Sequence, residues 1–259
     1  MVVLKTPLEI EKMRVAGGVV AKCLKEISES IIPGETTTMD IDKLAEELLK
    51  KYNAISSFKN YRGYPATACV AVNEEVVHGI PGIRVLKEGD IVGIDLGAIV
   101  DGWHGDSAIT VAVGKVSKAA EKLMQVTKDA LYKGIDAAKP GNRLSDIGNA
   151  IQNYVEKHGY TVVKDLAGHG IGKEMHEDPQ VLNYGSPGRG LLLEEGMTLA
   201  IEPMVNIGSF KVITLPDNWT VVTKDGSLSA HFEHTVAITK DGPDILTAVP
   251  TEEALRIHG

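Results

Sequence analysis

Apolar residues recur at helical spacing in four stretches of the chain, which predicts four amphipathic helices. The first begins at Thr6, which can cap a helix, followed by Pro7 in the first turn and Glu9 to complete a capping box. Its apolar positions continue to Ile31, and Pro33-Gly34 ends it. The other three patterns predict helices at about 38–52, 117–138 and 144–158, the last ending at Gly159.

The sequence between and after these helices alternates apolar and polar residues and is rich in turn residues, as β-strands and their connections are. Such sequence fills about 54–113 and most of the chain after residue 160. Two helices followed by strands, twice over, predict an α+β fold in which helices cover a sheet.

Two strings recur at one offset, which predicts an internal repeat. The Pro-Gly pair at 33–34 returns at 140–141, 107 residues later. The string LKEGDIVGID, ending at Asp95, returns at the same offset as LEEGMTLAIE, ending at Glu202. The repeat makes these two acids equivalent positions. No low-complexity linker divides the chain, so we expect one domain over residues 1–259 with halves at about 1–113 and 114–259.

Composition places the chain among ordinary globular proteins, with 259 residues, 43% hydrophobic and 24% charged. A net charge of −8 gives no electrostatic footprint for nucleic acid. Two cysteines without a metal or redox spacing favour a reducing compartment. The N-terminus lacks a signal-peptide pattern, and no apolar run approaches the ~20 residues of a membrane span. We therefore expect a cytoplasmic protein with neither nucleic-acid nor membrane partners.

The stretch GIDLGAIVDGWHGDSA places two aspartates in a run that otherwise resembles buried strand. Asp101-Gly102 between them is a strong two-residue hairpin signal. With these residues as the loop, Asp106 faces Gly97 and Asp95 faces Ala108. We expect both carboxylates on one face of the hairpin, as diagonal neighbours about 7–8 Å apart by Cα.

Two buried carboxylates side by side require a shared proton, a basic partner or a cation. Candidate further ligands are His169 in GHGIG, Glu202 in AIEPMV and Glu233 in AHFEHTVAIT. A lone acid near a strand end is usually solvated, but four carboxylates and a histidine exceed the needs of one tetrahedral zinc. The set favours two divalent ions bridged by Asp106 and Glu233. The flanking histidines left out of this predicted set are His104, His231 and His234.

The five candidate ligands match, in order and local context, the five metal ligands of the methionine aminopeptidases, and the chain resembles that family over nearly its whole length. The motifs VVHGIPG, GIDLG, DGWHGDSA, GHGIG, MHEDPQV, IEPM and FEHT carry the resemblance. It implies the pita-bread fold, in which two pseudo-symmetric α+β halves pack helices on a curved, mainly antiparallel sheet. It also implies two metal ions (cobalt, manganese, iron or zinc) bridged by the metal ligands Asp106 and Glu233, with Asp95 on one ion and His169 and Glu202 on the other.

The resemblance implies a catalytic domain that removes the initiator methionine from nascent peptides with a small second residue, through a hydroxide held between the metals. Glu202 would act as general base and then acid. His176 would donate toward the developing oxyanion, and His78 would contact the substrate beyond the scissile bond. We expect a monomer with transient ribosome proximity. The methionine slot would be lined by Phe58, Tyr61, Tyr64, Cys69 and Trp219, although aromatics of this kind also form ordinary core.

Two alternatives share parts of this pattern. Proline-specific aminopeptidases and dipeptidases share the five ligands but usually carry a separate N-terminal domain, whereas the first helix here begins at about residue 7. Metal-free peptide-binding proteins of this fold typically lose ligands, and here all five positions carry competent side chains. The 26-residue spacing from His176 to Glu202 resembles the compact type I form. One departure is Met175, where some members have an aromatic residue.

Overall fold

The computed structural model describes residues 2–249, and it contains the four predicted helices within a residue or two of their expected ends. Thr6 Oγ1 accepts from the backbone N–H of Glu9, whose side chain accepts in return from the backbone of Thr6, so the predicted capping box is confirmed. Gly159 follows the last helix at a φ of 83°. The helices are α1 (Pro7–Ser30), α2 (Thr38–Lys51), α3 (Lys118–Ala137) and α4 (Leu144–Lys157).

The strands form four small sheets in the described chain, and their pairings are all antiparallel. One sheet has the order β1-β4-β2 with β5 on β4, and the largest has the order β15-β14-β9-β7-β8. The other two have the orders β13-β10-β6 and β11-β12-β3. The strands are β1 (Ile55–Ser56), β2 (Cys69–Val72), β3 (Glu75–Val77), β4 (Ile91–Val100), β5 (Trp103–Ala112), β6 (Thr161–Val162), β7 (Gly168–Gly170), β8 (Glu177–Val181), β9 (Thr198–Ile201), β10 (Met204–Asn206), β11 (Val212–Thr214), β12 (Val221–Thr223), β13 (Ser229–His231), β14 (His234–Thr239) and β15 (Gly242–Ile245).

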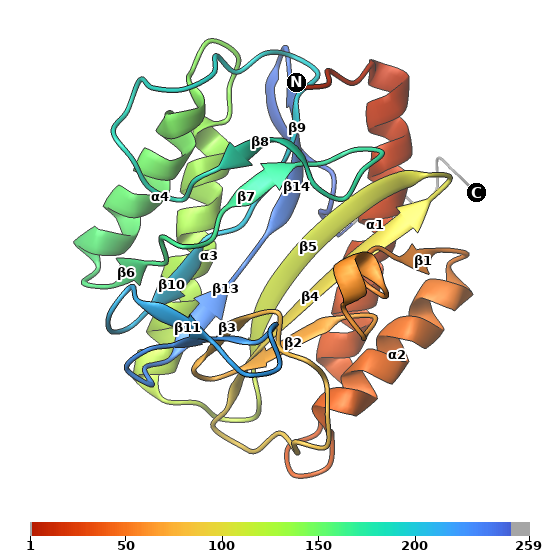
Figure 1. The fold of residues 1–259 in the computed structure, drawn as a ribbon, viewed down its shortest axis with the longest axis vertical. Helices are drawn as coiled ribbons and strands as arrows, with labels where there is room; N and C mark the ends of the chain where they lie inside the picture. Colours follow the sequence, from red (N-terminus) through yellow and green to blue (C-terminus); the bar gives the residue numbers. More distant parts are fainter. Residues whose placement is uncertain (1, 250–259) are drawn as a thin grey trace.

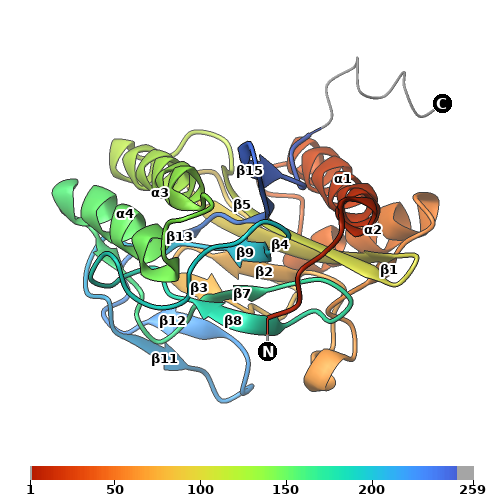
Figure 2. The same cartoon turned by 90° about the horizontal axis from the view of Figure 1, so that it is seen from above.

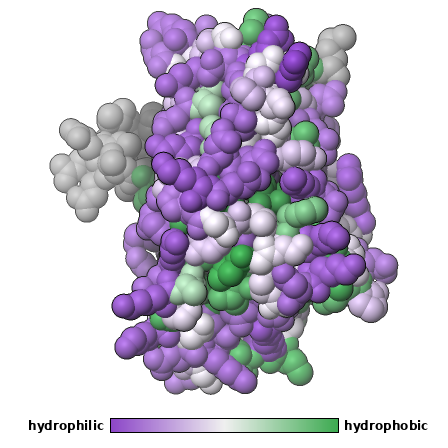
Figure 3. All heavy atoms as spheres, turned by 90° about the vertical axis from the view of Figure 1, so that its left-hand side faces the viewer, coloured by the Kyte–Doolittle hydropathy of each residue, from purple (hydrophilic) through white to green (hydrophobic). Residues whose placement is uncertain are grey.

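The helices lie in two pairs on one side of the sheets, α1 with α2 and α3 with α4 (Figures 1 and 2). One hydrophobic cluster joins α1 and α2 to β2 and β4, and a second joins α3 and α4 to β9 and β14. The side of the molecule near α4 presents a mainly hydrophilic face with scattered apolar residues (Figure 3). Among residues 2–249, the helices lack the combination of length and hydropathy that spanning a membrane requires.

The same elements recur at the offset of the sequence repeat. Strand β4 begins at Ile91 and β9 at Thr198, while α1 ends at Ser30 and α3 at Ala137, each pair 107 residues apart. The repeated Pro-Gly turns both use a left-handed glycine, with φ of 80° and 89°. We propose on this basis that about 1–113 and 114–259 are related halves of one domain. The last ten residues of the second half lie outside the described chain.

Candidate metal centre

The hairpin of β4 and β5 holds the first two carboxylates. Asp101 and Gly102 form its turn with φ of 49° and 78°, the left-handed pair that a tight hairpin requires. The register pairs Asp95 with Ala108 and Asp106 with Gly97, as the sequence predicts. Both aspartates therefore lie on the same face of the hairpin as diagonal neighbours, because their cross-strand partners are each two residues from the other aspartate.

The other two carboxylates stand where a second strand pairing is interrupted. Strand β9 pairs with β14 up to Ile201 opposite His234, and β10 pairs with β13 from Met204 opposite His231. The same register runs through both pairings, so Glu202 and Glu233 occupy facing positions in the gap between them. Neither glutamate belongs to a strand.

Hydroxyl side chains join the two carboxylate pairs across the middle of the molecule. Thr235 Oγ1 donates to the carbonyl of Asp106 at 2.8 Å and accepts from its backbone N–H at 3.0 Å. Ser107 Oγ donates to the carbonyl of Glu233 at 2.6 Å, and the N–H of Glu233 donates to the carbonyl of Ala108 at 2.9 Å. These bonds fix β5 beside the segment that carries Glu233.

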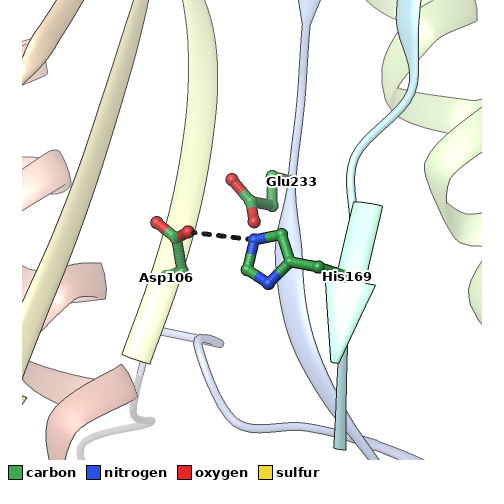
Figure 4. Close-up of side chains that lie close together, drawn as sticks. All are labelled: Asp106, His169 and Glu233. Atoms are coloured by element: carbon green, nitrogen blue, oxygen red, sulfur yellow. Dashed lines mark ion pairs between the residues drawn. The ribbon is translucent and has the colours of Figure 1, made fainter. Parts of the chain in front are cut away.

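His169 completes the cluster from β7 (Figure 4). Its Nδ1 bonds to the carbonyl of Gly170 at 2.8 Å, and a carbonyl can only accept, so Nδ1 carries the proton and Nε2 keeps its lone pair. That Nε2 lies 3.8 Å from Asp106 Oδ2 and 3.9 Å from Glu202 Oε1. One ligand atom each from Asp106, His169 and Glu233 lie within 4.8 Å of one another. Only glycine fits on either side of His169, because a side chain at 168 or 170 would meet backbone oxygens.

The charges of the cluster fit divalent cations. Asp95 Oδ1, Asp106 Oδ1 and Glu233 Oε1 are buried and have no hydrogen-bond partner among the described residues. Burial, then the neighbouring acids, raises the pKa of Asp95 and Glu233 well above the ordinary carboxyl value. Burial also raises the pKa of Asp106 to about 8 and of Glu202 to about 7. Buried oxygen donors without hydrogen-bond partners, whose protons a bound cation can displace, are suited to hard or borderline metal ions.

A pocket opens onto this cluster, and every residue that the sequence predicted for the site lines it. Cys69 lies opposite Asp95 in the β2–β4 pairing. Tyr64 is held by bonds from its hydroxyl to the carbonyls of Ala68 and Gly79, and packs edge-on against Trp219 at 5.1 Å between ring centroids. The predicted slot residues are thus side by side as a wall: Phe58, Tyr61, Tyr64, Cys69 and Trp219.

Two histidines border the pocket beside the acids. Tyr61 stacks on His176 at 5.3 Å, and its hydroxyl lies 2.9 Å from His176 Nδ1. Desolvation and the nearby His169 lower the pKa of His176 to about 3, so its ring is neutral at pH 7. His78 stands edge-on to Trp219, has a left-handed φ of 58°, and burial lowers its pKa to about 4.

The flanking histidines have different surroundings. His104 Nδ1 bonds to Ser57 Oγ at 2.9 Å, and His234 Nδ1 bonds to Thr247 Oγ1 at 2.8 Å, so both rings have partners away from the cluster. His231 instead faces Glu202. Sequence reasoning did not predict Arg62 as part of the pocket, although it follows Tyr61 directly and lines the same pocket.

The fold and this cluster define a class of metal-dependent peptidase. Residues 11–240 match the model of metallopeptidase family M24, and the chain belongs to that family. The chain is 56% identical to a methionine aminopeptidase of Clostridium acetobutylicum over 248 residues, 95% of this chain and 99% of the relative. It superposes with a TM-score of 0.94 on the crystal structure of methionine aminopeptidase from Rickettsia prowazekii, at 46% identity, covering 96% of this chain and all of that one.

A prolidase from Pyrococcus horikoshii is a more distant structural neighbour. Its TM-score is 0.76 at 26% identity, and the match covers 96% of this chain but 64% of the prolidase. Both the identity and the share of the neighbour that is covered therefore favour the methionine aminopeptidases over the proline-specific enzymes. Membership of a metallopeptidase family also implies that the chain uses divalent metal.

Proposed function

We propose that this protein is a metal-dependent aminopeptidase that releases N-terminal methionine from peptides with a small second residue. The observation that carries the proposal is one pocket that combines a carboxylate–histidine cluster with an apolar aromatic wall. The cluster provides metal-assisted hydrolysis, and the wall suits an unbranched apolar side chain. Relatives of nearly the same length, at 46–56% identity, carry the name methionine aminopeptidase.

We assign the metal ligands as the sequence predicts. Asp106 and Glu233 would lie between two ions, Asp95 would bind one, and His169 with Glu202 would bind the other. The short distances from His169 Nε2 to Asp106 and Glu202 support this grouping. When bound, two such ions lower the pKa of a water and polarise the scissile carbonyl. The number and identity of the ions (cobalt, manganese, iron or zinc) remain predictions from the sequence.

The chain's own groups then move and stabilise charge. Glu202 lines the pocket with the other assigned ligands, where it would accept a proton from water and return it to the leaving nitrogen. The Tyr61 hydroxyl lies 2.9 Å from His176 Nδ1, and when it donates there, Nε2 carries the proton and can donate to the oxyanion. Neutral His78 is placed to contact the peptide beyond the scissile bond, because it borders the same pocket.

Substrate comparison tests the proposal. With metal added, Met-Ala-Ser should lose its methionine. An Ala-Pro dipeptide and Met-Leu-Ser should be poor substrates, because the proposed specificity is for methionine followed by a small residue. Preference for Ala-Pro would favour the prolidase class. Binding of Met-Ala-Ser without hydrolysis, with or without metal, would favour a peptide-binding module. Monomeric state, cytoplasmic location and transient ribosome proximity are further proposals that rest on the sequence.

A further inference from the structure

One buried donor beside the candidate metal centre has no partner. His231 is 4% exposed, and its Nε2 makes no hydrogen bond to any described residue. The acceptor it faces is Glu202 Oε2, at 3.5 Å. Native structures rarely leave a buried polar atom without a hydrogen bond, so this one calls for an explanation.

The backbone of His231 is fixed from two sides. Thr110 Oγ1 donates to its carbonyl at 2.7 Å and accepts from its N–H at 3.0 Å. The register of β13 with β10 places it opposite Met204, two residues beyond Glu202. These contacts place the main chain of His231 beside Glu202. The ring is buried there, with Nε2 directed to Glu202 Oε2.

The two oxygens of Glu202 face different neighbours. Oε1 lies 3.9 Å from His169 Nε2, on the side of the metal ligands, while Oε2 lies on the side of His231. A carboxylate oxygen can only accept, so Nε2 must approach it as an N–H donor. We propose that His231 is a positioning residue that holds Oε2 through Nε2–H, so that Oε1 alone is presented to a metal ion and to the substrate water.

Such a bond has a consequence for binding as well as for turnover. Partners in the second coordination layer orient a ligand and are generally worth about 10–100-fold in metal affinity or activity. Without the bond, Glu202 can rotate and offer either oxygen, or turn away from the ion. The inference rests on the proposed function only in taking Glu202 as a metal ligand and proton acceptor.

Three substitutions at one position separate this role from packing. His231→Gln places an amide nitrogen near the position of Nε2, His231→Asn places it near that of Nδ1, and His231→Leu removes the donor. Mn²⁺ affinity of the metal-stripped protein is measured by calorimetry, together with the visible spectrum of the Co²⁺ form, the melting temperature, and kcat and KM on Met-Ala-Ser.

We expect the Leu and Asn variants to bind Mn²⁺ about 10–100-fold more weakly, with an altered Co²⁺ spectrum and lower kcat at similar KM. The Gln variant should retain most of the affinity and the native spectrum. Full Mn²⁺ affinity in the Leu variant would overturn the proposal. Equal losses in all three variants, in proportion to the fall in melting temperature, would also overturn it, because they would indicate a packing role. A Gln variant as impaired as the Leu variant would overturn it as well, because it would indicate that His231 is itself a metal ligand.

The metal-binding measurements and the peptide assay test the role of His231 and the proposed function separately. Mn²⁺ affinity and the Co²⁺ spectrum are measured without peptide, so they report on His231 whatever the substrate is. The predicted ranking of variants in a protein that leaves Met-Ala-Ser intact would refute the proposed function and keep the role of His231. Methionine release together with equal Mn²⁺ affinities in all the variants would support the proposed function and refute the role of His231.

Discussion

Glu202 is surrounded by groups that pull its proton equilibrium in opposite directions. Burial raises its pKa to about 7, and His169 opposes that shift. In the metal-free protein this carboxyl group therefore titrates near neutral pH. In the hydrolysis that we propose, the same group takes a proton from water and returns it to the leaving nitrogen. The same side chain is also an assigned metal ligand, so its two roles must be separated by experiment.

Glu202→Gln keeps the shape of the side chain and removes its basicity. We expect kcat on Met-Ala-Ser to fall by about 10²–10⁴-fold, while metal remains on Asp106 and Glu233. Stopped assays and metal analysis of the same samples measure both quantities. Glu195→Gln, at an exposed position, is the matched control and should behave as wild type. Turnover within a few-fold of wild type, with metal bound, would refute the general-base role.

His176→Ala tests the oxyanion donor. Removing one such donor generally lowers kcat by about 10²–10³-fold, and metal content should stay unchanged because His176 is not an assigned ligand. Tyr61→Phe removes the hydroxyl 2.9 Å from Nδ1 and should give a smaller loss in the same direction. Loss of both metals from the Ala variant would instead make His176 a ligand.

At the scale of single residues, local pattern predicted the five candidate ligands, and the resemblance to the methionine aminopeptidases implied the other pocket residues. Neither predicted how each side chain is held. The five candidate ligands were predicted because carboxylates are conspicuous in apolar strands, and the structure brings them together. The place of His231 beside Glu202 could not be predicted, because the bond to Thr110 and the β13–β10 register determine where its backbone lies. Arg62 gave no pattern that separates it from an ordinary exposed arginine.

At the scale of secondary-structure elements, local sequence predicted the register of the β4–β5 hairpin but not that of the strands around Glu202 and Glu233. Asp101-Gly102 predicts the register from local sequence alone, and that prediction is confirmed. The facing positions of Glu202 and Glu233 had no such signal, because local sequence does not specify the course of the chain between Asn206, where β10 ends, and Ser229, where β13 begins. Local sequence therefore predicted the relative positions of Asp95 and Asp106, whereas those of Glu202 and Glu233 depend on long-range packing.

Gly105 of β5 directly precedes Asp106 and lies where α1 packs closely against the strand. Gly105→Ala tests this close packing. A Cβ there would lie 2.5 Å from the backbone nitrogen of Gly17, so helix and strand would have to separate. Overpacking of this kind costs about 1–3 kcal/mol or more in the free energy of unfolding. Denaturant titration of the metal-free protein measures it. Gly82→Ala, which has no neighbour within 4 Å, is the control, and equal stability of the two variants would contradict the packing account.

Over the whole molecule, folding gathers four carboxyl groups in one buried cluster. Folded Asp106 and Glu202 have pKa values of about 8 and 7, against ordinary values of 3.8 and 4.5. The folded metal-free protein therefore holds protons that the unfolded chain has already released above about pH 5, and its stability decreases as pH rises through this range. The histidines with lowered pKa, such as His78 and His176, act oppositely but only below about pH 6.5.

The metal-free protein should consequently lose melting temperature between pH 7 and pH 8, where the carboxyl groups alone determine the slope. Saturating Mn²⁺ should raise the melting temperature, by the equivalent of about 2.7 kcal/mol at 100 times its Kd, and oppose the fall with pH, because bound ions replace the protons. Thermal scans across this range, with and without Mn²⁺, measure both effects. A metal-free melting temperature that rises from pH 7 to pH 8 would show that the acids are not held protonated.

The most direct test of the account is metal content and methionine release measured on one sample. Protein stripped with chelator and reloaded with Co²⁺ or Mn²⁺ should bind two ions per chain, as the sequence and the five candidate ligands predict. It should release methionine from Met-Ala-Ser only in the loaded form, and Asp106→Asn should lose both properties together. Unchanged hydrolysis by the stripped protein, or no bound ion at saturating metal, would contradict the central claim.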